Sequence, residues 1–185
     1  MVTEIEVGAW EGVANAGGVR RVRLVATHQV QSLWVAAQTA VLPRGALVLT
    51  DDAELTDLRF ATGRCGFGVT ADNTVHGRQY VVEVTMDVPR NSVALVNWLT
   101  ARANMTWLAL IEDANGACWL LGHPDSDGLT MGWAGASGGK AGEANRVGIV
   151  LRGAQWCPIW ALNSLELQDL NLADFSFDFS TDFLI

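Results

Sequence analysis

Residues 91–121 read NSVALVNWLTARANMTWLALIEDANGACWLL and decide how this chain of 185 residues is expected to fold. The first half predicts an α-helix over residues 91–104, because Asn91 and Ser92 can both cap its N-terminus and apolar residues follow with a period near 3.6. The second half predicts a β-hairpin, since two apolar runs flank a short polar loop. This helix and hairpin form a compact unit against which other strands can pack.

The loop of the predicted hairpin contains a turn signal. Asn115 and Gly116 supply the positive φ angles that a tight type I′ turn requires. Asp113 is expected to stabilise the turn through its side chain. The predicted turn-forming residues are therefore Asp113, Asn115 and Gly116. On a strand, the neighbouring Glu112 and Asp113 point to opposite faces, so they cannot form a catalytic pair by themselves.

The remainder of the chain predicts mainly β structure. The clearest strand lies within residues 75–88, where apolar and polar side chains alternate, as in an antiparallel sheet with one buried and one solvated face. Glycines within residues 63–70 suggest bulges in an irregular strand, and residues 71–74 predict a turn. The other strands are expected at residues 19–25, 32–39, 46–50, 129–134, 146–152 and 156–162.

The chain is predicted to form one core domain, residues 19–163, with an extended arm at each end. Residues 1–18 are the N-terminal arm, and residues 164–185 are a C-terminal arm with five acidic residues and no basic one. Four phenylalanines in the second arm share one face of a strand-like pattern: Phe175, Phe177, Phe179 and Phe183. Such a row stays exposed unless something covers it, so we expect this arm to dock on a neighbouring molecule.

The net charge of −8 argues against tight binding of nucleic acid. The only cluster of cations, Arg20-Arg21-Val22-Arg23, is expected to form a solvated face or ion pairs between subunits. The N-terminus has neither the basic flank nor the apolar core of a signal peptide, and no apolar run approaches the length that spans a membrane. We therefore expect a soluble protein made in the cytoplasm, with no membrane contact.

The cysteines and histidines predict no metal site. Cys65, Cys118 and Cys157 are far apart in sequence and are expected to be buried reduced thiols. His28, His76 and His123 have no metal-ligand spacing and are expected at the surface or in loops.

Three short motifs partly match known catalytic or ligand-binding sequences. Gly135-Ala136-Ser137-Gly138-Gly139 matches the nucleophile elbow of a hydrolase, but no helix former and no acid-histidine pair follows it. Gly139-Lys140 ends like a phosphate-binding loop that lacks its first glycine and its hydroxyl. Asp125-Ser126-Asp127-Gly128 lacks the remaining ligands of a calcium loop and predicts a solvated turn. We therefore predict no catalytic residue, no metal and no cofactor, and a protein that is not an enzyme.

Eight tryptophans are the most unusual feature of the composition. Trp107 and Trp119 flank the hairpin turn and are expected to be cross-strand neighbours, and Trp156 and Trp160 are expected to share one face of the last strand. Core and interface packing is the favoured interpretation. The alternative is a carbohydrate-binding module, in which exposed tryptophans stack on sugar rings.

Three stretches carry a resemblance to a known family. Residues 15–24 read NAGGVRRVRL, residues 111–122 read IEDANGACWLLG with Asp127-Gly128-Leu129 behind them, and residues 139–145 are a loose glycine-rich match. In this order, over about residues 15–155, the chain resembles a family of tailed-bacteriophage virion proteins that includes tail-tube and tail-ring subunits. The resemblance implies an antiparallel β-sandwich or half-barrel with one flanking helix, assembled into rings.

The resulting hypothesis is a virion structural protein, a ring-forming subunit of the tail tube or of a tail or neck assembly. We expect its own copies to be its partners in stacked rings. Its other expected partners are further virion proteins and DNA, which passes without tight binding. The predicted oligomer interface comprises Phe175, Phe177, Phe179, Phe183, Trp156 and Trp160. The alternatives are the glycan-binding module and, as a third class, a hydrolase that depends on Ser137.

Overall fold

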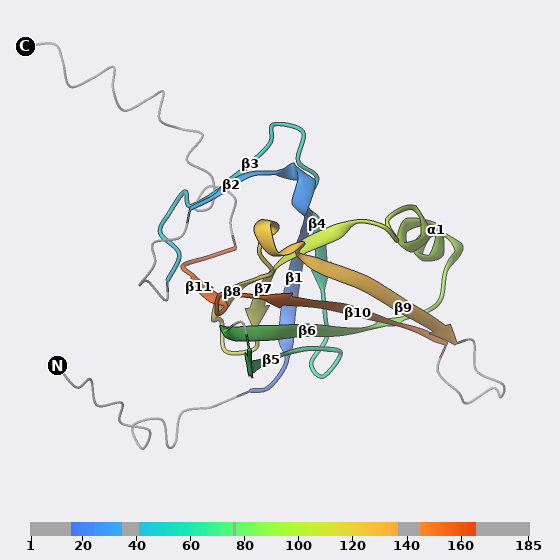
Figure 1. Ribbon diagram of the computed structural model, residues 1–185. Helices are drawn as coiled ribbons and strands as arrows, with labels where there is room; N and C mark the ends of the chain where they lie inside the picture. Colours follow the sequence, from blue (N-terminus) through green and yellow to red (C-terminus); the bar gives the residue numbers. More distant parts are fainter. Residues whose placement is uncertain (1–15, 35–40, 76, 137–144, 166–185) are drawn as a thin grey trace, which may run out of the picture.

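The computed structural model describes residues 16–34, 41–75, 77–136 and 145–165. Within them the chain is mainly β with one α-helix, as predicted, and all pairs between named strands are antiparallel (Figure 1). The strands are β1 (Val19–Ala26), β2 (Val30–Leu33), β3 (Leu47–Leu49), β4 (Thr56–Arg59), β5 (Cys65–Thr74), β6 (Gly77–Pro89), β7 (Thr106–Asp113), β8 (Cys118–Leu121), β9 (Leu129–Ala136), β10 (Arg146–Gln155) and β11 (Trp160–Leu162). The helix is α1 (Val93–Ala101), and two 3₁₀ turns are η2 (Thr27–Gln29) and η3 (Pro124–Ser126).

Two leaves of sheet face each other across the main hydrophobic core. The first leaf has the strand order β5-β6-β10-β9, and the second has the order β4-β1-β7-β8-β11. They join along one edge of β7, where Thr106 and Trp107 pair with β9 and residues 109–112 pair with β8. In Figure 1, β1 of the second leaf crosses β6 and β10 of the first. The architecture is a β-sandwich whose leaves are continuous at one corner.

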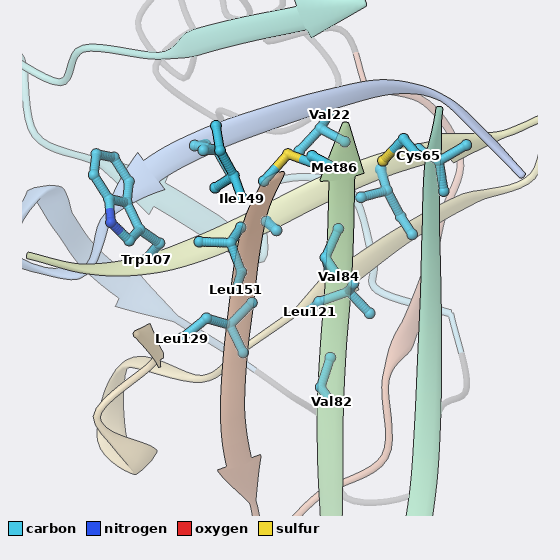
Figure 2. Packing of buried hydrophobic residues seen from close by; sticks show 14 of the residues in the cluster. Val22, Cys65, Val82, Val84, Met86, Trp107, Leu121, Leu129, Ile149 and Leu151 are labelled. Carbon is cyan, nitrogen blue, oxygen red and sulfur yellow. The ribbon is translucent and has the colours of Figure 1, made fainter. Parts of the chain in front are cut away.

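The main core fills the space between the leaves (Figure 2). On β6, Val82, Val84 and Met86 are buried, whereas Glu83 and Thr85 between them are exposed, which confirms the predicted alternation. The neighbouring strands β9 and β10 add the buried side chains Leu129, Ile149 and Leu151, and the facing leaf adds Val22 and Leu121. Full burial of one such aliphatic side chain contributes about 1.5–3 kcal/mol, so this layer is the main source of stability.

β7 is buried on both faces, which explains its continuous apolar sequence. Trp107 and Ile111 point into the main core, whereas Leu108 and Leu110 point into a second core on the other side of the sheet. The second core is closed by the β2–β3 hairpin, by β11 and by Leu165. The β2–β3 hairpin therefore forms a third layer over the second leaf.

α1 connects β6 of the first leaf to β7 of the second. Ser92 caps the helix, because its Oγ accepts a hydrogen bond from the backbone N–H of Leu95 at 3.2 Å. Leu99 is fully buried in the main core. The helix is shorter than the predicted residues 91–104, because the chain leaves it through a turn in which the N–H of Met105 donates to the carbonyl of Arg102.

The β7–β8 hairpin is present, but its turn is not type I′. Gly116 has a φ of +86°, whereas Asn115 is not in the left-handed region. The N–H of Gly116 donates to the carbonyl of Asp113, so a three-residue loop ends in a left-handed glycine. Asp113 Oδ1 accepts from the N–H groups of Asn115 and Ala117 at 2.8 and 2.9 Å, which stabilises the turn.

The hairpin register also corrects the expected tryptophan pair. Trp119 lies opposite Ile111, whereas Trp107 lies opposite Ala26 and Leu129. β8 ends at Leu121, before it could reach a position opposite Trp107. Trp107 instead stacks on Trp98 of α1, with 6.0 Å between ring centroids.

The bulges predicted within residues 63–70 and the turn predicted at residues 71–74 are wrong. β5 pairs with β6 in unbroken register from Cys65 opposite Met86 to Thr74 opposite Gly77. The glycines fit a regular strand because they lie on the outward face, opposite Thr85 and Glu83. Local glycine content therefore signalled irregularity where strand pairing imposes regular geometry.

Two of the arginines of β1, Arg21 and Arg23, are half-buried and form ion pairs within the chain, whereas Arg20 is exposed as predicted for a solvated face. Arg21 donates to Asp57 of β4 through its Nε and Nη2 atoms, the latter at 2.6 Å, and Arg23 approaches the same carboxylate at 3.6 Å. The hydrogen bond from Arg21 is the main reason why the pKa of Asp57 lies below its ordinary value. These contacts join β1 to the edge strand β4 within one chain.

The last predicted strand, residues 156–162, is wrong in its first half. Only Trp160–Leu162 forms β11, because Gln155 holds the preceding segment in another conformation. Buried Gln155 accepts from the N–H of Gly122 through Oε1 and donates to the carbonyl of Cys157 through Nε2, both at 2.9 Å. Trp156 and Trp160 therefore do not share a strand face.

Candidate functional site

The first leaf ends in an open strand edge along β5 (Figure 1). Within the described ranges, the only strand that pairs with β5 is β6. Residues 68–74 of β5 and residues 77–79 of β6 are exposed, so this end of the hairpin extends beyond the core. No strand among the described residues pairs with the outer side of residues 68–73, where another strand could add to the sheet.

β5 lacks the features that usually protect such an edge. Natural edge strands carry lysine, proline or a bulge that prevents association with other chains. The sequence of β5, CGFGVTADNT, contains Asp72 as its only charged residue, and its register has no bulge. A regular unprotected edge of this length favours a strand from another molecule as its neighbour.

The opposite side of the same leaf has a second open stretch. β9 pairs with β7 only at Leu129 and Thr130, and its residues 131–136 pair with β10 alone among the strands of the described ranges. The first leaf therefore presents an open edge on each side.

The outward face of the first leaf is built from small side chains. Gly66, Thr85, Gly148 and Val150 border a shallow hollow of about 360 Å³ on this face. Neighbouring outward positions on β9 are occupied by Gly132 and by other small residues, Thr130 and Ala134. Small side chains therefore line the middle of this face, and long charged side chains lie around them.

The charges on this face are largely paired. Asp87 Oδ2 lies 2.6 Å from Nη1 of Arg64 and 3.8 Å from Nη1 of Arg146, and Glu83 lies 3.9 Å from Nε of Arg152. The other carboxylate oxygen of Asp87 is buried without a hydrogen-bond partner among the described residues. Pairing with carboxylates reduces the attraction of these arginines for an external anion.

A second hollow, of about 460 Å³, lies between the tip of the β5–β6 hairpin and the loop around η3. Its lining includes Trp156, Arg78, Gln79, Ser126 and Asp127. The side chain of Trp156 is 62% exposed, and its ring packs edge-on against His123 with 5.2 Å between centroids. This hollow combines an aromatic surface with polar side chains that donate hydrogen bonds and others that accept them.

His123 lies in the loop before η3, one of the two positions predicted for it, but it is buried there. Its side chain is 4% exposed and contacts the rings of Trp156 and Trp160. Its Nδ1 accepts from the N–H of Asp125 at 3.1 Å, so this nitrogen is unprotonated. Burial lowers the pKa of His123 below its ordinary value of 6.5, and the carboxylate of Asp125 only partly opposes this effect.

The protein is expected to lose stability as the pH falls below about 6.5, because the unfolded chain then binds a proton at His123 that the folded protein excludes. This contribution is complete above pH 6.5 and decreases until the lowered folded pKa is reached. His123→Asn retains an acceptor for the N–H of Asp125 without titrating. Urea unfolding of both proteins between about pH 8 and pH 5 should show that the free energy of unfolding falls less in the variant than in the unmodified protein. Equal losses would contradict this role of His123.

The predicted interface residues have different positions. Phe175, Phe177, Phe179 and Phe183 lie outside the described residues, as do Ser137 and Lys140. Trp156 is exposed, whereas Trp160 is 2% exposed and belongs to the second core. The interface role of the phenylalanines and Trp156 therefore stays a prediction, and Trp160 offers no exposed ring in this chain.

The three cysteines are buried and free, as predicted. Burial raises the pKa of Cys65 to about 12 and that of Cys157 to about 11, so both are protonated at neutral pH. No group of three or more His, Cys, Asp and Glu residues with the arrangement of a metal site occurs in the part of the chain that the structure describes. No helix among the described residues is long and apolar enough to span a membrane.

Two of the sequence stretches that carry the family resemblance, residues 15–24 and 111–122, meet in space at the start of β1 and the end of β7. The N–H of Ala16 donates to Asn115 Oδ1 at 2.9 Å, and the N–H of Ala114 donates to the carbonyl of Gly18 at 3.0 Å. These residues form a structural junction beside the origin of β5, bordered by Gly66 and Phe67. Comparisons of the chain with models of protein families, with curated proteins and with solved structures found no match.

Proposed function

We propose that this protein is a structural subunit that assembles head to tail into a ring of a tailed-phage virion, in the tail tube or in a tail or neck assembly. The observation that carries the proposal is the long, unprotected edge of β5. In a monomer such an edge is an aggregation hazard, whereas in a ring it becomes an interface. The sequence resemblance supports the same class of protein.

The two open stretches of the first leaf suggest how the ring would close. Residues 68–74 of β5 and residues 131–136 of β9 lie at opposite sides of this leaf and have similar lengths. Pairing of β5 in one copy with β9 in the next would be a heterologous contact, which closes into a ring when the rotation between copies permits. The first leaves would then form a continuous wall.

The composition of that wall is compatible with DNA passage. Its outward face carries small side chains, and its arginines at positions 64, 146 and 152 lie against carboxylates. The whole chain has a net charge of −8. Tight binding of DNA depends on unpaired cations that displace counterions from phosphates, so a surface of this kind would let a duplex slide.

Negative-stain electron microscopy of the purified protein, together with sedimentation velocity over a range of concentrations, tests the proposal. Rings or stacked rings of uniform diameter are the expected result. A monodisperse monomer at high concentration, absent from any particle of a phage that encodes it, would contradict the proposal.

Deletion of residues 166–185 is expected to leave the core domain folded and to weaken assembly. Leu165 is buried in the second core, and its carbonyl accepts a hydrogen bond from Arg23, so a chain that ends there retains both contacts. The deleted segment contains the alternating phenylalanines. Circular dichroism and the sedimentation coefficient separate the two effects. Loss of the folded signal would show that the segment is part of the core, and unchanged assembly would exclude a docking role.

A further inference from the structure

We propose that the hollow beside Trp156, at the tip of the β5–β6 hairpin, binds a neutral pyranose. The hollow of about 460 Å³ falls in the size range of small-molecule sites. This inference does not depend on the proposed ring, and it assigns a location to the carbohydrate-binding alternative that the tryptophan content suggested.

The aromatic surface of the hollow is held in place by its neighbours in the chain. Trp156 lies between Gln155 and Cys157, which are both buried, and Gln155 is hydrogen-bonded to the backbone on both sides. The edge-on contact with buried His123 restrains the indole ring further. A fixed, exposed indole offers a flat apolar surface with little ordering needed on binding.

The polar lining fits hydroxyl groups better than it fits an ion. Arg78 can only donate hydrogen bonds and Asp127 can only accept them, whereas a sugar hydroxyl does both. An anionic ligand would be repelled by Asp127, and a cationic one by Arg78. A neutral polyol with an apolar ring face uses the whole lining.

Titration of the full-length protein with four probes tests the site: the methyl glycosides of glucose, galactose, mannose and N-acetylglucosamine. Binding would be followed by saturation-transfer and indole-resonance NMR. A monosaccharide is expected to bind with a dissociation constant on the order of 1 mM. Trp156→Ala is expected to weaken binding about tenfold or more, and Trp156→Phe less, because a smaller ring still covers part of the sugar face.

Trp34→Ala is the matched control, because Trp34 is 64% exposed but does not line the hollow. It should bind the probes like the unmodified protein. Absence of binding by all four probes at roughly ten times the expected constant would overturn the proposal. Equal weakening by Trp34→Ala would do the same, and so would a Trp156→Ala variant that binds normally but no longer assembles.

Discussion

Val69→Lys is expected to abolish assembly while the chain stays folded. Val69 lies on β5 opposite Val82, on the side of the strand that faces the core, yet 37% of it is exposed because β5 is at the edge. In the monomer a lysine there can extend its ammonium group into water. A neighbouring strand paired with β5 would surround that charge, which is how inward-pointing lysines protect natural edges. The association constant at each interface should fall by at least about tenfold, which removes rings from micrographs and from sedimentation profiles.

Val41→Lys is the matched control for this result. Val41 is 46% exposed and forms a bridge to Ala161 of β11, at the far end of the second leaf, so the same exchange adds the same charge away from both open stretches. This variant should assemble like the unmodified protein. If Val69→Lys also formed normal rings, the edge of β5 would not be the interface, and the proposed function would lose the observation that carries it. If both variants failed to assemble, the change in net charge would explain the result instead of the position of the lysine.

Local sequence signals predicted the elements whose geometry depends on neighbours in the chain. Ser92 caps α1, Asp113 closes the β7–β8 loop, and β6 alternates as its sequence indicates. Each of these depends on residues a few positions apart, so the sequence contains the necessary information.

The failures concern features that are set by distant partners. The glycines of β5 suggested bulges, but pairing with β6 holds them in a regular strand. His123 gave no sign of burial, because the rings that cover it come from Trp156 and Trp160, more than thirty positions later in the chain. The four-residue spacing between Trp156 and Trp160 predicts that both share one strand face at an interface. The hydrogen bonds of buried Gln155 interrupt the strand instead, so Trp156 is exposed and Trp160 is buried.

The open edge of β5 could be predicted only in part from the sequence. The lack of lysine, arginine and proline in residues 65–74 is visible in the sequence, and it becomes informative only once β5 is known to be the outermost strand. Edge position is a property of the whole topology. A polar, glycine-containing segment in the interior of a sheet would have the same composition without being open to another molecule.

Gly153→Ala is expected to destabilise the fold by about 3 kcal/mol, whereas Gly148→Ala on the same strand should be neutral or slightly stabilising. A Cβ at Gly153 would overlap the carbonyl oxygen of Gly128 and lie 2.9 Å from Cδ2 of Leu129, at the point where the loop after η3 passes against β10. The oxygen belongs to the backbone, so β9 would have to shift at its junction with β7.

At Gly148 the nearest atom to an added Cβ, the carbonyl oxygen of Ala134, is 3.9 Å away. Neither Gly148 nor Gly153 has a positive φ, so alanine suits the backbone at both and the difference isolates the close contact. Urea unfolding of the two variants, followed by tryptophan fluorescence, measures it. Because the shift would fall on the pairing of β7 with β9, which joins the two leaves, the substitution at Gly153 should also lower the cooperativity of unfolding. Similar urea midpoints for the two variants would mean that the leaves can move apart at this corner without loss of stability. In that case the junction of β7 with β9 would not hold the sandwich together.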